Sequence, residues 1–350
     1  MKIALIGKSL TTLVLAYVLA SKKISVEIIS KNKIKPYVSS RTLALSKNNY
    51  DFLKKILKKK IKSWKTSKIK IYNKKFHDDS SVEFYNEEKE LFHLVKYTEI
   101  YNIFKNEILK NNFIKIKNKK SNNNNLIINT DINSDLSKKY FYKKIDKSYR
   151  SLVYTGIIEH KKIENSIAHQ IFTNDGPLAY LPISNNKTSI VYSYNGKKKI
   201  NSHEIKKILN KYKIGYQINK IGKIEKFEIK FLVLKNYFYK NILAFGDVLH
   251  KVHPLAGQGF NMTIRDIITL SDIIDSKIDL GQEIDASIGL EFEKKLKHIN
   301  FIFSSGIDFI YEFFNFDNKI NNKLSKPIFK ILNNFNILKK KSIFFADKGF

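Results

Sequence analysis

The first thirty residues alternate between apolar runs and short polar breaks. KIALI at residues 2–6 is typical of a buried strand, residues 10–21 are apolar on most helical faces, and residues 24–29 are β-branched and strand-like. Because GKS at residues 7–9 interrupts the apolar run and a second strand follows at once, we interpret the segment as strand, turn, helix and strand rather than as a cleaved leader. This βαβ unit predicts the opening of a doubly wound nucleotide-binding sheet.

Four segments between this unit and the middle of the chain carry weaker patterns. Residues 50–62 place apolar side chains near helical spacing among lysines, which predicts an amphipathic helix, and residues 97–110 predict another. Residues 67–87 alternate in short strand-like pieces. Residues 111–135 are rich in Asn and Lys and are expected to form a loop between short strands.

The second half of the chain changes from strand patterns to helical ones. Residues 149–235 alternate strand-like runs and turns, which predicts an antiparallel sheet, and a helix at 203–212 interrupts it. A short apolar strand is expected at 241–245, a helix at 260–275, and mostly helical structure from there to residue 350. The mixture indicates an α/β fold.

The net charge of +32 changes this picture little. Lys, Asn and Ile are abundant along the whole chain, so we favour a composition-wide bias, as an AT-rich genome would produce, over a patch specific for nucleic acid. Attraction to an anionic membrane surface is the alternative interpretation. The chain has no cysteine, which excludes disulfides and thiolate metal sites. No stretch reaches the roughly 18 apolar residues of a membrane span.

Segment 246–266, GDVLHKVHPLAGQGFNMTIRD, carries the strongest chemical pattern. Asp247 follows a predicted buried strand, and an open α/β sheet places ligands beyond the carboxyl ends of its strands. Pro254 stiffens the next loop, and Gly257 and Gly259 let the backbone approach a ligand closely. A helix is expected to follow, with its N–H groups and positive dipole end turned to that ligand. The segment therefore predicts a site for an electron-rich or anionic group, made largely of backbone.

This segment resembles the second FAD motif of the class A flavoprotein monooxygenases. Within that class it is most similar to the ubiquinone-biosynthesis hydroxylases of the UbiH, UbiF and UbiI type. Twelve residues match the family pattern at fixed spacing, which disfavours a chance glycine turn before a helix. The matching residues are Gly246, Asp247, His250, His253, Pro254, Ala256, Gly257, Gln258, Gly259, Asn261, Arg265 and Asp266.

The resemblance implies roles for several of these residues. Gly246 and Asp247 would bind the cofactor, with the Asp247 carboxylate hydrogen-bonded to the ribityl or phosphate region of FAD. Gln258, with the glycine on either side of it, would present backbone N–H groups to the pyrimidine edge of the flavin. Those N–H groups would stabilise negative charge on the reduced flavin. Asn261 would lie near the same ring.

Two histidines stand inside the same segment. His250 and His253 have a spacing that could indicate a metal, but no third ligand accompanies them. Packing or bracing of the loop is the better interpretation, and we expect no metal at this site.

Two further segments resemble the same family. SSRTLALS at 39–46 resembles its D-x-R-x-x-ALS stretch, which implies that Arg41 lies by the FAD or at the mouth of the active site. Taken alone, Arg41 is a surface charge. GPLAYLP resembles a strand of the family's substrate domain, which implies that its first residues, Gly176 and Pro177, lie near the flavin face together with Pro254. Without the resemblance, the same residues form a Gly-Pro turn between two strands.

The N-terminal dinucleotide pattern departs from the family. Where G-x-G-x-x-G is expected, only Gly7 remains as a cofactor-binding candidate, and Ser9 and Thr12 carry side chains where the backbone should meet the pyrophosphate. Ser30 stands where an acid should bind the adenosine ribose. Of the family's middle motif, only Asp131 remains as a binding candidate. Because these losses all concern the ADP half of FAD, weak or unusual binding of FAD is one expectation.

The resemblance also implies the domain organisation. The expected fold class is α/β, with a doubly wound, Rossmann-like FAD-binding domain, an inserted antiparallel β-sheet substrate domain and a helical C-terminus. The expected limits are 1–65, 92–148 and 236–290 for the discontinuous FAD-binding domain, 66–91 and 149–235 for the substrate domain, and 291–350 for the helical region.

The function that the resemblance implies is hydroxylation of the aromatic ring of a polyprenyl phenol in ubiquinone biosynthesis. FAD would be the cofactor, NAD(P)H the reductant and O₂ the co-substrate, and no side chain is assigned as the catalytic base. The alternatives are another flavin oxidoreductase of the same fold, or a degenerate relative that serves as a partner in a biosynthetic complex. We expect a cytoplasmic protein, or one peripheral to the inner membrane, with the membrane surface and other ubiquinone-biosynthesis proteins as partners.

Overall fold

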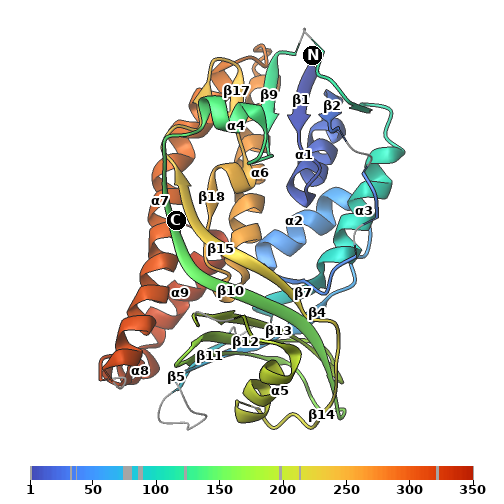
Figure 1. Cartoon of the computed structure of the whole chain (residues 1–350). Coiled ribbons are helices and arrows are strands. Elements are labelled where there is room, and N and C mark those ends of the chain that lie inside the picture. The colour runs from blue at the N-terminus through green and yellow to red at the C-terminus, as the bar shows by residue number, and fades with distance from the viewer. Residues whose placement is uncertain are drawn as a thin grey trace.

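The α/β fold is visible in Figure 1, where a parallel sheet stands above a large, strongly bent antiparallel sheet. The computed structural model describes residues 2–31, 34–36, 38–73, 81–85, 90–121, 124–196, 199–212, 214–320 and 323–349. A doubly wound domain, an inserted antiparallel sheet and a helical C-terminus are all present, so the expected fold class is confirmed. Among the described residues, no helix combines the length and the apolar character needed to cross a bilayer.

The N-terminal βαβ unit forms as the apolar pattern predicts. Strand β1 (Lys2–Ile6) pairs in parallel with β2 (Ser25–Ile29), and helix α1 (Leu10–Ser21) connects them. Ten of the twelve residues of α1 are buried, because the helix packs between the sheet and helices α3 and α6. The complete sheet has the order β16-β17-β9-β1-β2-β8, and its other strands are β8 (Ile114–Lys117), β9 (Leu126–Asn129), β16 (Phe238–Tyr239) and β17 (Ile242–Ala244).

The large sheet brings together strands from distant parts of the chain. Its long central strand is β10 (Lys144–His160), and β5 (Lys68–Asn73) pairs in parallel with β11 (Ile167–Thr173). Helix α5 (Ser202–Lys211) covers one face of the sheet through Ile205 and Leu209. The remaining strands are β6 (Ser81–Tyr85), β12 (Gly176–Ser184), β13 (Lys187–Tyr194), β14 (Ile218–Ile221), β15 (Glu225–Leu234) and β18 (His250–Lys251).

The opposite face of the large sheet packs against the C-terminal half of the chain. Phe172, Val153 and Phe231 from the sheet form one cluster with Leu255 and with Met262 of helix α6. Helix α6 spans Gln258–Asp279, and two single 3₁₀ turns, η2 (Gly246–Val248) and η3 (Leu255–Gly257), precede it. The predicted helix at 260–275 is therefore present and longer at both ends. A short helix, α4 (Asp135–Tyr140), follows β9.

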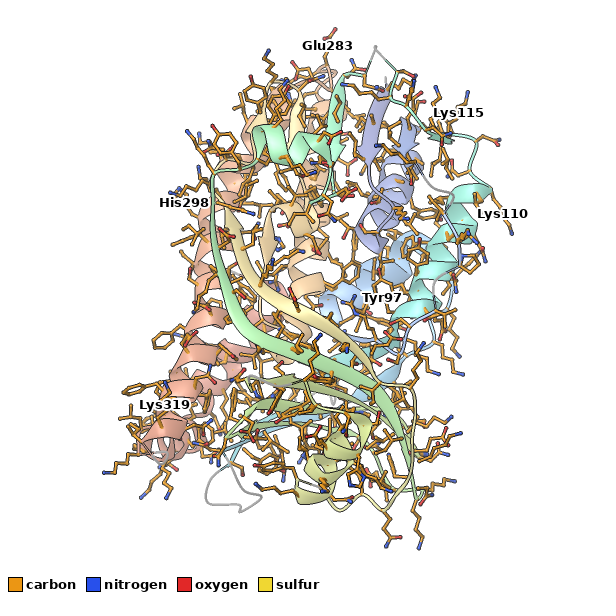
Figure 2. All side chains as sticks on the ribbon, in the orientation of Figure 1. Tyr97, Lys110, Lys115, Glu283, His298 and Lys319 are labelled. Carbon is orange, nitrogen blue, oxygen red and sulfur yellow. The ribbon has the colours of Figure 1, made fainter. Side chains whose placement is uncertain are left out.

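Helix α7 (Ser287–Lys319) runs along one edge of the molecule and ties the two sheets together. Near its start, Gly289 lies directly against the Phe238 ring of the parallel sheet. Near its end, Phe314 stacks on Phe172 of the large sheet, with ring centroids 3.6 Å apart. His298 and Lys319 mark the length of this edge in Figure 2. Helices α8 (Ser325–Asn334) and α9 (Asn336–Lys348) follow.

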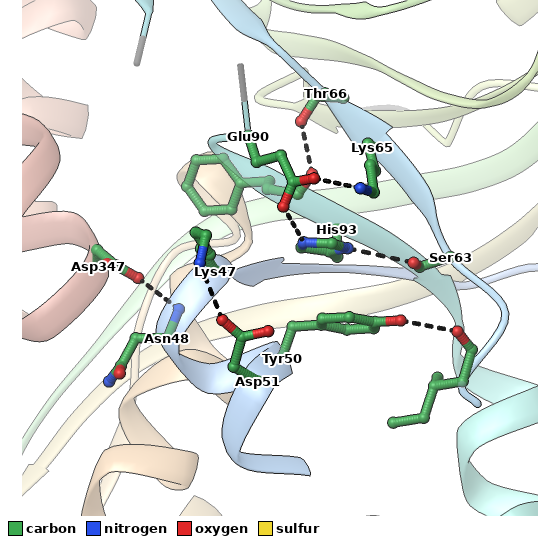
Figure 3. Close-up of polar contacts among 12 residues, drawn as sticks. Lys47, Asn48, Tyr50, Asp51, Ser63, Lys65, Thr66, Glu90, His93 and Asp347 are labelled. Atoms are coloured by element: carbon green, nitrogen blue, oxygen red, sulfur yellow. Dashed lines mark hydrogen bonds and ion pairs between the residues drawn. The ribbon is translucent and has the colours of Figure 1, made fainter. Parts of the chain in front are cut away.

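A third, small sheet connects the two larger ones. It has the order β3-β7-β4, from β3 (Thr42–Ser46), β7 (Phe92–Lys96) and β4 (Trp64–Thr66), and helix α3 (Tyr97–Leu109) follows β7. Helix α2 (Lys47–Leu57) starts before the predicted helix at 50–62. It also ends before it, because Lys58 adopts the left-handed conformation and stops the helix. Figure 3 shows how α2 is fixed: its Tyr50 ring stacks on His93 of β7, and Asp347 of α9 accepts a hydrogen bond from the Asn48 N–H.

Candidate functional site

Three predicted cofactor residues lie at the same edge of the parallel sheet. Gly7 follows β1, Asp131 follows β9, and Asp247 follows β17. Because these three strands are parallel neighbours, their carboxyl ends meet at one edge. The chain order reverses between β1 and β9, and such a switch point is where open α/β sheets bind ligands.

The two acids at this edge differ in how they are held. The Asp247 side chain is 69% exposed and forms an ion pair with Lys251 at 3.6 Å. Asp131 accepts a hydrogen bond from the Asn133 N–H at 2.9 Å, which closes the turn before α4. Asp247 is therefore open to a ligand, whereas Asp131 already has a structural task.

The turn after β1 is filled by hydroxyl groups. Gly7 has a φ of +130°, and a Cβ there would lie 2.4 Å from the Thr130 hydroxyl, so only glycine fits. The Thr12 and Thr130 hydroxyls are hydrogen-bonded at 2.6 Å, and Thr130 also donates to the Ile6 carbonyl. Ser9 caps helix α1 by accepting the Thr12 N–H at 3.4 Å. Two threonine side chains thus occupy the contact between helix and strands that glycine would leave open.

No acidic residue directly follows β2, the position where a dinucleotide-binding fold has an acid for the adenosine ribose. Ser30 follows the strand, as the sequence shows. Glu27 is buried and turned to the other side, where Lys2 and Lys117 lie 2.7 Å and 2.5 Å from its carboxylate. Burial acts to raise the pKa of Glu27, but hydrogen bonds from both lysines and from Ser121 outweigh it and lower the pKa to about 2. Glu27 therefore stabilises the sheet edge.

The start of helix α6 forms a narrow cradle against strand β3. Gly257 has a φ of +65°, and a Cβ there would lie 2.9 Å from the Ala44 Cβ. A side chain at 257 would therefore be strained and would push β3 away. At Gly259 the nearest atom to a Cβ is 3.8 Å away, so this backbone is accessible. The first N–H groups of any α-helix lack acceptors within the helix, but at the start of α6 the Gly257 N–H donates to the Pro254 carbonyl and the Gln258 N–H to the Leu255 carbonyl.

The Gln258 side chain is the most unusual polar group of the cradle. It is only 4% exposed, yet neither its amide oxygen nor its amide nitrogen has a hydrogen-bond partner among the described residues. A buried amide without partners costs about 1–3 kcal/mol. The sequence pattern implied only a backbone role for Gln258, and a match to a glycine-rich motif gives no signal for the buried side chain. An incoming ligand with donors and acceptors would satisfy it.

Asn261 holds the cradle together rather than facing an open site. Its side chain donates to the Ala44 carbonyl at 2.7 Å and accepts the Ser46 N–H at 3.0 Å. The Asn49 amide donates to the same oxygen at 2.9 Å. Asn261 is fully buried, so this side chain fixes β3 and α2 to the first turn of α6. Its expected place near a flavin ring stays a prediction, with its amide already engaged.

Arg41 lies between the small sheet and the large one. Its guanidinium stands 5.2 Å from the Tyr97 ring centroid and 5.3 Å from that of Phe227 on β15. Figure 2 places Tyr97 in the middle of the molecule, where α3 approaches the long strands. Beside it, the Ser39 hydroxyl donates to Glu225 of the large sheet at 2.7 Å. The segment 39–46 therefore joins the two sheets, with Arg41 at the junction.

Strand β12 turns one side toward the cradle region. Pro177 pairs with Phe172, so both share the face of the sheet that packs against Leu255, the residue after Pro254. Gly176 is required by its turn, because a Cβ would lie 1.9 Å from the Ser193 carbonyl oxygen. The structure thus gives Gly176 a structural role, and the expected places of Pro177 and Pro254 near a flavin stay predictions.

His250 braces the loop, as predicted. Its Nε2 lies 2.6 Å from the Asp266 carboxylate, and both side chains are buried. The second Asp266 oxygen accepts a hydrogen bond from Asn300 of α7 at 3.0 Å. This chain of contacts joins β18, α6 and α7. No cluster of three or more His, Cys, Asp or Glu suited to a metal lies within the part of the chain that the structure covers.

His253 is buried between two tyrosines. Its ring stacks on Tyr311 at 4.2 Å and meets the Tyr149 ring edge-on at 5.3 Å. Neither ring nitrogen has a hydrogen-bond partner within the described parts of the chain. Burial lowers the pKa of His253 to about 3. The imidazole therefore stays neutral at physiological pH, and loop packing is what the contacts support.

Replacing His253 by phenylalanine should remove part of the acid sensitivity of the fold. The unfolded chain takes up a proton at His253 near pH 6.5 and the folded chain only near pH 3, so wild-type stability falls as the pH drops below 6.5. When the pH falls from 7 to 5, the free energy of unfolding of wild type should fall by about 2 kcal/mol more than that of the variant. Urea unfolding at both pH values measures these free energies. If variant and wild type differ by the same amount at both pH values, His253 is not a buried neutral imidazole.

A polar cavity of about 570 Å³ adjoins the same loop. Tyr149 and Tyr311 separate it from His253, and no residue of segment 246–266 lines it. It opens between the large sheet and α7. Its walls are Lys147, Ser148, Tyr149, Asn174, Asn195, Tyr311, Glu312, Asn315, Asn318 and Lys319.

Comparison with known proteins agrees with this arrangement. The family described as "FAD binding domain" matches residues 159–279. The ubiquinone biosynthesis monooxygenase COQ6 of Dictyostelium discoideum is 34% identical over 105 residues, which cover 30% of this chain and 21% of that protein. The 3-demethoxyubiquinol 3-hydroxylase of Escherichia coli is 29% identical over 152 residues, 41% of this chain and 38% of that protein. The chain thus spans less than half the length of these relatives.

Solved structures share the fold over nearly the whole chain. The p-nitrophenol 4-monooxygenase of Pseudomonas putida superposes with a TM-score of 0.78 at 11% identity and covers 99% of this chain and 98% of its own. HpxO of Klebsiella pneumoniae, solved with FAD and uric acid, gives a TM-score of 0.70 at 12% identity and covers 100% and 97%. At these identities the likeness shows the fold alone. The motif, the matched segments of these relatives and the shared fold show that this chain is similar to FAD-dependent monooxygenases, among them ubiquinone-biosynthesis hydroxylases.

Proposed function

We propose that this chain hydroxylates the aromatic ring of a polyprenyl phenol in ubiquinone biosynthesis, with NAD(P)H as reductant and O₂ as co-substrate. The observation that carries the proposal is the cradle at the start of α6, where the buried side-chain amide of Gln258 has no hydrogen-bond partner among the described residues. The names of the two curated relatives support the substrate class. Neither relative is covered over two thirds of its length, so the activity of the whole protein is inferred.

The residues of the cradle fit the ring half of a flavin. Gly259 leaves its backbone accessible to a planar group, and the positive end of the α6 dipole favours negative charge there. Gln258 offers one donor and one acceptor side to the polar edge of such a ring. A bound flavin, reduced by NAD(P)H, would supply the O₂ chemistry. The protein would bind and orient the ring and exclude water.

An apolar wall for the substrate ring stands opposite the cradle. Leu181 and Ile183 of β12 pack against an apolar cluster that contains Ala44, the residue next to Gly257. Phe172 and Pro177 continue the same side of the sheet. Such a wall suits an aromatic ring with an apolar tail and keeps water away from the reacting atoms. No side chain on it is assigned as a base.

The test is a turnover assay with the flavin-loaded protein and a short-chain prenylphenol. We expect NAD(P)H and O₂ to be consumed only when the phenol is present, and the product to gain one oxygen atom. Consumption without a hydroxylated product would favour another flavin oxidoreductase of this fold. A second candidate function is that of a partner protein without catalysis, which requires that the chain bind no flavin. The departures from the dinucleotide pattern around Gly7 and Thr12 favour this candidate.

We also infer contact with a membrane surface, where polyprenyl phenols reside. The outer sides of α7, α8 and α9 expose large apolar side chains among lysines. Such helices bind anionic lipid through both kinds of side chain. Cosedimentation with phosphatidylglycerol vesicles should occur at low salt, and its absence would contradict the inference. The exposed residues are Phe301, Ile302, Phe309, Ile310, Phe316, Phe335, Ile337 and Phe344, with Lys323, Lys326, Lys330 and Lys341.

A further inference from the structure

The two ends of the proposed cofactor site differ in how well their own polar groups are satisfied. At the start of α6, Gln258 keeps a buried amide without any hydrogen bond to the described residues. At the start of α1, the Thr12 hydroxyl is hydrogen-bonded to the hydroxyls of Ser9 and Thr130, and Thr130 also donates to the Ile6 carbonyl. The first end needs a ligand to complete it, whereas the second is complete without one.

Space at the N-terminal end is also taken. The Thr12 side chain is fully buried, and the Thr130 hydroxyl lies 2.4 Å from where a Cβ of Gly7 would be. A dinucleotide turn uses glycine at the position of Ser9 so that the backbone can meet a pyrophosphate. Here the Ser9 hydroxyl already accepts the Thr12 N–H, one of the donors that such a phosphate would use.

The adenosine end lacks its usual anchor. An acid after the second strand binds the ribose hydroxyls in such folds, and Ser30 stands there instead. The nearby acid, Glu27, is buried and held by Lys2 and Lys117 on the far side of the strand. The matched family segment, residues 159–279, contains the α6 cradle and leaves out this entire unit.

We propose that this chain holds its flavin through the flavin mononucleotide half and gains little from the adenosine half, so that FMN binds about as tightly as FAD. The inference rests on the proposed function, because it assigns the cofactor to the same cradle. The chemical class of the ligand is an isoalloxazine with a ribityl phosphate. The side chains that set this preference are Thr12, Thr130 and Ser30.

The test is a titration of the flavin-free protein with FAD and with FMN, followed by the quenching of flavin fluorescence. We expect the two dissociation constants to agree within about tenfold, since the adenosine would lack its charged hydrogen bond. FAD binding more than about a hundredfold tighter than FMN would overturn the inference. If neither flavin binds, the proposed function fails as well, so the two failures are distinguishable.

A variant extends the test to one residue. Ser30→Glu restores the acid at a half-buried position, and we expect FAD to gain about tenfold over FMN, the value of one charge-assisted hydrogen bond. Ser342→Glu, on the exposed side of α9, adds the same charge elsewhere and should leave the ratio unchanged. An equal shift in both variants, or none in Ser30→Glu, would count against the assignment.

Discussion

Gln258→Met should stabilise the flavin-free protein and weaken flavin binding by at least about tenfold. The substitution keeps the length of a buried side chain and removes two polar atoms that have no partner in the described structure. Because an unsatisfied buried amide costs about 1–3 kcal/mol, the flavin-free variant should gain stability of that order. A bound flavin that hydrogen-bonds to the Gln258 amide would lose those hydrogen bonds in the variant and therefore bind more weakly. Opposite changes in stability and in affinity are the signature of a binding residue.

Urea unfolding without flavin and a flavin titration measure the two effects. Gln282→Met is the matched control, because Gln282 is exposed and accepts a hydrogen bond only from Lys277 among the described side chains. The control should change neither quantity. A Gln258→Met variant that is less stable without flavin, or that binds flavin as tightly as wild type, would show that the amide serves the fold.

Asp266→Ala should destabilise the protein by about 3–5 kcal/mol. Its carboxylate is fully buried and hydrogen-bonded to His250 at 2.6 Å and to Asn300 at 3.0 Å. Removing it leaves an imidazole and an amide buried without their acceptor, and it disconnects β18 from α6 and α7. Since α6 begins at the cradle, flavin affinity should fall together with stability.

The loss of stability is measured as the difference in free energy of unfolding between wild type and Asp266→Ala. Asp51→Ala is the control, because Asp51 is 52% exposed and pairs with Lys47 at the surface, where such pairs contribute less than about 1 kcal/mol. A loss at Asp266 no larger than that of the control would mean that the buried network carries little of the stability.

The local parts of the fold follow directly from the sequence. Residues 2–29 form the predicted βαβ unit because both strands are apolar throughout and the helix is apolar on most faces. Long-range pairings are different. β5 pairs with β11 across about a hundred residues, and no local pattern specifies that contact. The helix predicted at 50–62 ends at Leu57, because tertiary contacts of Tyr50 and a left-handed Lys58 determine its limits.

The candidate site was predictable in its backbone and less so in its side chains. The motif predicts a glycine turn before a helix, and Gly257 takes the left-handed conformation directly before α6. The buried Gln258 amide and the Asn261 contacts with Ala44 and Ser46 depend on where β3 packs, which the motif does not encode. At the other end, the Thr12–Thr130 pair converts an altered motif into a hydrogen-bonded contact that sequence alone could describe only as a loss.

The absorbance spectrum of the purified protein after dialysis against FAD tests the central claim most directly. If the start of α6 is a flavin site, the protein should carry one flavin per chain, with bands shifted from those of the free cofactor, and Gln258→Met should carry less. A protein that stays colourless after dialysis against FAD and against FMN would contradict the account.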